Sequence, residues 1–161
     1  LHLSQDEALA HTDALITTLL SNGLLREVDD ELLPPDAHCK QFHSAWLLSR
    51  CMQETLQRYA VVLTILDKEK SISRGELERE SKKVAERLSV LYGLSSPEFY
   101  DKNVLSSFIS ALKDNHWLDS EKDGSLKYSE ECEALREDVM ALIWPEMMQH
   151  LENVALNSDK D

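Results

Sequence analysis

Two amphipathic helical patterns joined by a short elbow, in residues 71–118, constrain the fold of this chain more than any other stretch. Ser73 followed by Glu76 is a capping-box pattern that predicts the start of the first helix. Gly93 predicts its end, because glycine readily adopts the left-handed conformation that terminates many helices. Apolar residues at three- and four-residue spacing predict one buried face on each helix. They are Leu77, Val84, Leu88 and Leu91 in the first helix, and Val104, Leu105, Phe108, Ile109 and Leu112 in the second.

A β-hairpin is predicted directly after the second helix. Residues 117–119 and 126–128 are short apolar runs, and Asp123-Gly124 between them favours a tight turn, because both residues tolerate positive φ. A helix followed by a two-stranded wing is the ending of a winged-helix unit. Residues 14–33 repeat this succession more faintly, so we interpret the chain as two such units, the first cut short on its N-terminal side.

The remaining segments are also predicted to be mostly helical. Helices are expected over 3–21, over 36–66 (as one helix or as two with a break near 39–43), from Ser129, and from Pro145. Residues 24–33 form a further expected hairpin, 67–71 a polar loop, and 59–66 the centre of the core. The predicted fold class is therefore mainly α, a helical domain with winged-helix-like units and short β-hairpins. The predicted domains are 1–35, 36–156 and a polar C-terminal tail at 157–161.

Charge and composition restrict the kinds of partner. The 161 residues carry 30 acidic against 17 basic side chains, a net charge of −13, which argues against nucleic-acid binding. No apolar run approaches the 18 or so residues needed to cross a bilayer. Three scattered cysteines without a CxxC motif indicate neither a disulfide framework nor a zinc knuckle, and favour a reducing compartment.

Two clusters of side chains were considered as sites. His38, Cys39 and His43 have poor spacing for one metal and no second ligand pair, so we expect no metal ion, and nothing indicates a cofactor. Five basic residues of the first helix are candidates for contact with an anion or an acidic partner: Arg74, Arg79, Lys82, Lys83 and Arg87. A solvated surface is the favoured interpretation, because glutamates interleave with them and Glu78–Lys82 has ion-pair spacing.

Four sequence runs resemble a known family. They are ETLQRYA at 54–60, RGELERES at 74–81, VAERLSVLYG at 84–93 and PEFYDK at 97–102. In this order and spacing they are similar to the C-terminal region of the bacterial membrane-bound glycerol-3-phosphate 1-O-acyltransferases. The resemblance covers most of the chain.

The resemblance implies an activity for the family enzyme rather than for this chain. The enzyme transfers an acyl group from acyl-CoA or acyl-carrier protein to the sn-1 hydroxyl of glycerol 3-phosphate, at the cytoplasmic face of the inner membrane. Its signature is His-x4-Asp, in which His is the general base and Asp orients it. No histidine here has an aspartate five positions later, and His2–Glu7 is the nearest approach. We therefore expect the catalytic domain upstream and assign no catalytic residue.

Two functions follow as hypotheses. The first is a non-catalytic accessory domain, inactive alone, that docks on or regulates the upstream acyltransferase domain of the same chain. In this hypothesis any membrane contact is made by the full-length protein. The second is a winged-helix module for protein–protein interaction without a role in a lipid enzyme, for example between copies of this chain in a homo-oligomer. A DNA-binding regulator is disfavoured by the acidic charge.

Overall fold

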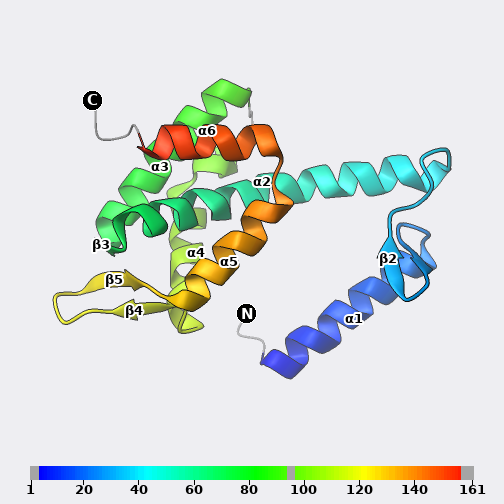
Figure 1. Cartoon of the computed structure of the whole chain (residues 1–161), viewed down its shortest axis with the longest axis horizontal. Coiled ribbons are helices and arrows are strands. Elements are labelled where there is room, and N and C mark those ends of the chain that lie inside the picture. Colours follow the sequence, from blue (N-terminus) through cyan, green and yellow to red (C-terminus); the bar gives the residue numbers. More distant parts are fainter. Residues whose placement is uncertain (1–3, 94–96, 157–161) are drawn as a thin grey trace. The chain divides into compact units, whose positions relative to one another are not determined.

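The computed structural model describes residues 4–93 and 97–156 (Figure 1). Its contacts group the chain into two compact units, Leu1–Met52 and Gln53–Asp161. The division falls inside helix α2 (Lys40–Glu69). The domain boundary expected between 35 and 36 stays a prediction, and the expected tail at 157–161 lies outside the described residues.

The first unit contains one helix, one hairpin and the beginning of α2. Helix α1 (Gln5–Ser21) starts with a capping box, in which the Ser4 and Glu7 side chains each bond the other's backbone N–H. Strands β1 (Arg26–Val28) and β2 (Glu31–Leu33) pair antiparallel around Asp29 and Asp30, both of which have positive φ. The predicted helix and hairpin are confirmed in this unit.

Helix α2 is continuous from Lys40 to Glu69, so it begins just after Cys39 and has no break within its length. The seven residues of this helix from Ala60 to Leu66 are all buried. This burial confirms the prediction that 59–66 supplies the centre of the core, with Tyr59 itself partly buried and stacked on Phe108 at 4.0 Å between ring centroids.

The second unit continues with short strands placed around a pair of helices. Their order is β3 (Ser71–Ser73), α3 (Arg74–Tyr92), the 3₁₀ turn η1 (Pro97–Tyr100), α4 (Lys102–Asp114), β4 (Leu118–Ser120) and β5 (Ser125–Tyr128). Helices α5 (Glu130–Leu142) and α6 (Pro145–Leu156) complete it. The three strands form one antiparallel sheet in the order β3-β5-β4.

Strand β3 corrects the prediction of a polar loop ending at residue 71. It has only three residues, too few to show the alternation that identifies a strand in sequence, and it forms because Ile72 pairs with Leu126 of β5. The order of elements is a helix, strand β3, two helices and a hairpin, and the second strand of the hairpin, β5, pairs with β3. This order is compatible with the predicted winged-helix unit. The mainly helical class with short hairpins is confirmed.

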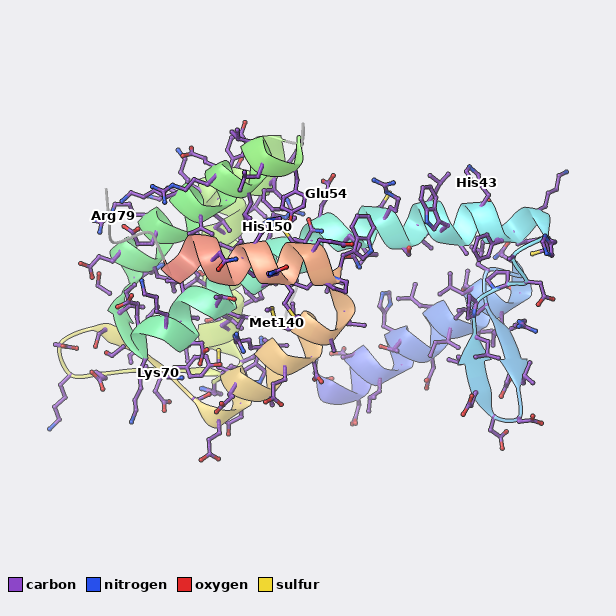
Figure 2. The ribbon with its side chains drawn as sticks, turned by 45° about the horizontal axis from the view of Figure 1, so that its top comes forward. His43, Glu54, Lys70, Arg79, Met140 and His150 are labelled. Atoms are coloured by element: carbon purple, nitrogen blue, oxygen red, sulfur yellow. The ribbon has the colours of Figure 1, made fainter. Side chains whose placement is uncertain are left out.

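The core of the second unit joins every helix in it. The fully buried large side chains come from α2, α3, η1, α4 and α6, and include Leu63, Leu88, Phe99, Ile109 and Leu151. Lys70, which Figure 2 labels, connects the end of α2 to the sheet: its carbonyl accepts from Tyr128 N–H at 2.9 Å, and its ammonium lies 4.6 Å from the Tyr128 ring centroid. The helices and the sheet therefore share one hydrophobic core.

One position of the predicted buried faces is wrong. Leu91 is 62% exposed because it lies in the last turn of α3, beyond the neighbours that cover Leu77, Val84 and Leu88. Many apolar residues of the first unit are exposed as well, and they include Leu9, Leu15, Trp46, Leu47, Leu48 and Met52. Helical spacing identifies a shared face, but it does not establish that the described structure covers that face.

We expect Leu63→Ala to lower the free energy of unfolding by about 2–5 kcal/mol, because it leaves a cavity in a fully buried part of α2. Val90→Ala on α3 is the matched control, since Val90 is 83% exposed and should change stability by no more than about 0.5 kcal/mol. Chemical denaturation of both variants measures the difference. Equal effects would contradict the assignment of the core.

Ser81→Ala should leave stability unchanged or raise it by about 0.5–1 kcal/mol. The Ser81 side chain is fully buried in α3, and among the described residues its hydroxyl has no hydrogen-bond partner. Removing an unpaired buried hydroxyl relieves a desolvation cost, and alanine is the better helix former. A loss of more than 1 kcal/mol in denaturant titration would show that the hydroxyl is satisfied in solution.

Candidate partner-binding surfaces

The five basic candidates lie along α3, which the Ser73 cap starts. The Ser73 hydroxyl oxygen accepts from Glu76 N–H at 3.3 Å, and Gly93 closes the helix with φ of 62°. Arg74, Arg79, Lys82 and Lys83 are exposed, while Arg87 is half-buried. The helix therefore displays four of its five basic candidates to solvent.

Arg74 is part of a hydrogen-bond network that joins α3 to α4. Its guanidinium lies 3.0 Å from Glu78 Oε1 and donates to the hydroxyls of Ser106 at 2.9 Å and Ser110 at 2.8 Å. The Ser106 hydroxyl in turn donates to Glu78 at 2.9 Å, and Lys102 Nζ lies 3.5 Å from the same carboxylate. Because its Nε and Nη2 groups donate to Glu78 of α3 and to Ser106 and Ser110 of α4, Arg74 joins the two helices.

Glu78 responds to this network. Burial alone would raise the pKa of its carboxyl, but the hydrogen bonds from Arg74, Ser106 and Lys102 together outweigh burial and lower the pKa below its ordinary value of 4.5. The Glu78 side chain is 12% exposed, so this carboxylate is protected from the solvent that weakens surface ion pairs.

The next basic residues along α3 also have carboxylate neighbours. Arg79, which projects from the helix in Figure 2, and Lys83 lie 3.0 and 3.1 Å from Glu80 Oε1. Burial opposes ionisation of Glu80, yet these two cations lower its pKa below the ordinary value. Lys82 lies 3.6 Å from Glu86, which corrects the expected Glu78–Lys82 pair. Contact of the basic cluster with an anion or partner stays a prediction.

An apolar groove of about 390 Å³ lies in the first unit, and the sequence analysis did not identify it. The end of α1, the turn after it and the end of the hairpin contribute Leu19, Leu24, Leu25 and Pro34. Helix α2 contributes Phe42, Ala45, Trp46, Leu48, Ser49 and Met52. A signal was present in the sequence, because residues 1–52 carry many large apolar side chains and a segment of this size has too little interior to bury them all.

Trp46, which lines the groove, also lies beside two polar side chains of α2. His43 and Arg50 flank Trp46, with the His43 ring 6.0 Å and the Arg50 guanidinium 5.0 Å from its ring (Figure 2 labels His43). Leu47 lies about half a turn from the groove, given 3.6 residues per turn. Trp46 thus stands at the edge of the groove, with its ring covered on one side by polar neighbours.

The described residues show little that indicates reaction chemistry. Among them, no three His, Cys, Asp or Glu side chains are grouped to hold a metal ion, and no helix is both long and apolar enough to cross a bilayer. Burial, assisted by the charge of Asp67, raises the pKa of the Cys132 thiol to about 11. This thiol is protonated at neutral pH and is a poor nucleophile.

Comparison with known proteins gives one consistent result. Residues 1–121 match a family model described as the glycerol-3-phosphate acyltransferase C-terminal region. A glycerol-3-phosphate acyltransferase of Alteromonas mediterranea is 91% identical over 157 residues, which cover 98% of this chain and 19% of the relative. One of Pseudoalteromonas atlantica is 53% identical over 154 residues, covering 96% and 19%. The chain spans about a fifth of the length of these curated relatives, and no solved structure matches it.

We expect Glu78→Gln to destabilise the chain by about 1–3 kcal/mol at pH 7, because it removes the charge that Arg74 and Lys102 contact. A carboxyl with a lowered folded pKa stabilises the fold above its ordinary value of 4.5, and this contribution is lost as pH falls through the folded pKa. The difference in the free energy of unfolding between wild type and variant should therefore become smaller below pH 4.5.

Glu86→Gln is the matched control for this experiment, because Glu86 pairs with Lys82 on the same helix but is 48% exposed. Its effect should stay within about 0.5 kcal/mol. Urea unfolding at a series of pH values measures both variants. A Glu78→Gln difference that does not change between pH 7 and pH 3 would contradict the network's role.

Proposed function

Because this chain belongs to the glycerol-3-phosphate acyltransferase family, as its C-terminal region, we propose that it is a non-catalytic accessory domain. In this role it docks on the acyltransferase part of the same polypeptide and supports its folding or regulates its activity. The match of residues 1–121 to the C-terminal family region, with 19% coverage of each relative, carries the proposal.

The chemistry of the chain supports a binding role over a catalytic one. None of its histidines is followed five positions later by an aspartate, the spacing of the His-x4-Asp motif. Among the described residues, no side chains are grouped to bind a metal ion, and the buried Cys132 thiol is protonated. The carboxylates and basic side chains of α3 are used within the unit, as at Arg74–Glu78. What the chain offers instead is a set of exposed apolar side chains in its first unit.

The full-length protein is proposed to transfer an acyl group from acyl-CoA or acyl-carrier protein to the sn-1 hydroxyl of glycerol 3-phosphate, the first step of phospholipid synthesis. Its place is proposed to be the cytoplasmic face of the bacterial inner membrane, with membrane contact made by parts of the protein outside this chain. The names of the Alteromonas and Pseudoalteromonas relatives support the reaction.

Deletion of this region from the full-length acyltransferase should reduce acyl transfer per folded molecule at least tenfold, or remove the folded enzyme altogether. Incorporation of a labelled acyl group into lysophosphatidate measures activity, and the enzyme's thermal transition measures folding. A shortened enzyme with unchanged activity and unchanged thermal stability would refute the accessory role.

The isolated chain should transfer no acyl group above the buffer background when it is supplied with acyl-CoA and glycerol 3-phosphate. The full-length enzyme is the positive control in the same assay. Any turnover by the isolated chain would contradict the non-catalytic assignment. If that turnover persisted after the six histidines were replaced in turn, a residue other than histidine would be the base.

A further inference from the structure

The apolar groove of the first unit is exposed for a physical reason. Of the residues in 4–52 whose exposure is described, Pro35 alone is buried, whereas the buried apolar side chains of the described chain begin at Ala60. A unit of this size has little interior of its own, so its large side chains remain at the surface. Contiguous exposed apolar side chains on a protein mark surfaces that another surface covers.

The net charge of the first unit selects the kind of occupant. Residues 1–52 carry eight acidic and three basic side chains, and one of the three, Arg26, is already 3.2 Å from Asp36. Such a surface repels an anionic bilayer or a nucleic acid. A polypeptide with an apolar face and neutral or basic flanks fits both the lining of the groove and its surroundings.

We propose that the groove binds an apolar segment of the acyltransferase part of the same polypeptide, an inference that rests on the proposed function. The relatives extend over about five times the length of this chain, so most of the protein lies outside it. A groove of about 390 Å³ accommodates only a few large side chains, and so small a contact is weaker than the interface of a typical stable complex, which buries roughly 800 Å² per partner.

Covalent attachment removes this difficulty. Two parts of one chain meet at an effective concentration near millimolar, so a small apolar contact suffices between them where it would fail between separate molecules. The same reasoning disfavours a second copy of the chain as the occupant, because a copy at cellular concentration lacks that advantage. The groove is thus a docking site for a tethered segment.

Leu48 and Leu47 provide a matched pair for the test. They are adjacent on α2 and equally exposed, at 47% and 46%, but Leu48 lines the groove and Leu47 lies on the other side of the helix. In the full-length enzyme, each is replaced in turn by the photo-crosslinker benzoylphenylalanine. After illumination in membranes, the adducts are separated by size and mapped by mass spectrometry.

The expected result is an intramolecular adduct from position 48 to a peptide that precedes this chain, with at least five-fold lower yield from position 47. A crosslinked dimer, a lipid adduct, adducts confined to residues 1–161, or equal yields from the two positions would each overturn the proposal. In parallel, Leu48→Glu in the full-length enzyme should lower activity several-fold while Leu47→Glu leaves it unchanged, and equal effects would also overturn it.

This outcome is separate from that of the deletion experiment. If deletion of the region impairs the enzyme but position 48 does not crosslink upstream, the accessory role stands and the groove assignment fails. If deletion has no effect, the proposed function itself fails, whatever the crosslinks show.

Discussion

Burial of the second half of α2 is the constraint on which the rest of the structure depends. The seven residues from Ala60 to Leu66 point in every direction around the helix, so each of its faces must be covered by another element. Helices α3, α4, α5 and α6 and the small sheet contribute buried apolar side chains to the same hydrophobic core as this segment. A helix buried on all sides requires neighbours on all sides, and the second unit is the set of elements that meets this requirement.

The sequence predicts this part of the fold well because the signals are local and strong. Ser73, Gly93 and Asp123-Gly124 specify backbone geometry directly, and the structure has a helix start, a helix end and a hairpin turn at those positions. Strand β3 was not predicted because it forms only by pairing with β5, more than fifty residues further along the chain, and three residues are too few to show a periodicity. The exposure of Leu91 was not predicted, because the spacing of apolar residues does not show how far the elements that pack on a helix extend along it.

The candidate site was only partly predictable for a similar reason. The basic residues of α3 are visible in the sequence, but their partners are determined by side-chain geometry. Glu78 forms ion pairs with Arg74 and with Lys102 of the next helix, and Lys82 forms one with Glu86. The spacing in the sequence instead favoured an ion pair between Glu78 and Lys82. The groove is made by residues from α1, the turn after it, the end of the hairpin and α2, and none of these segments is distinctive by itself. The proposal that the groove binds a segment of the same polypeptide needs both the acidic charge of the first unit and the greater length of the relatives.

The continuity of α2 also has a consequence for hydrogen exchange. One unbroken ladder of backbone hydrogen bonds runs from a segment whose side chains are mostly exposed, near His43 and Leu47, to a segment that is fully buried, near Leu63. Amides of the buried segment open only when the whole unit unfolds, while those of the exposed segment open by local fraying. Protection factors should therefore rise steeply along a single helix. A bound segment that covers the exposed part would raise its protection and flatten this gradient.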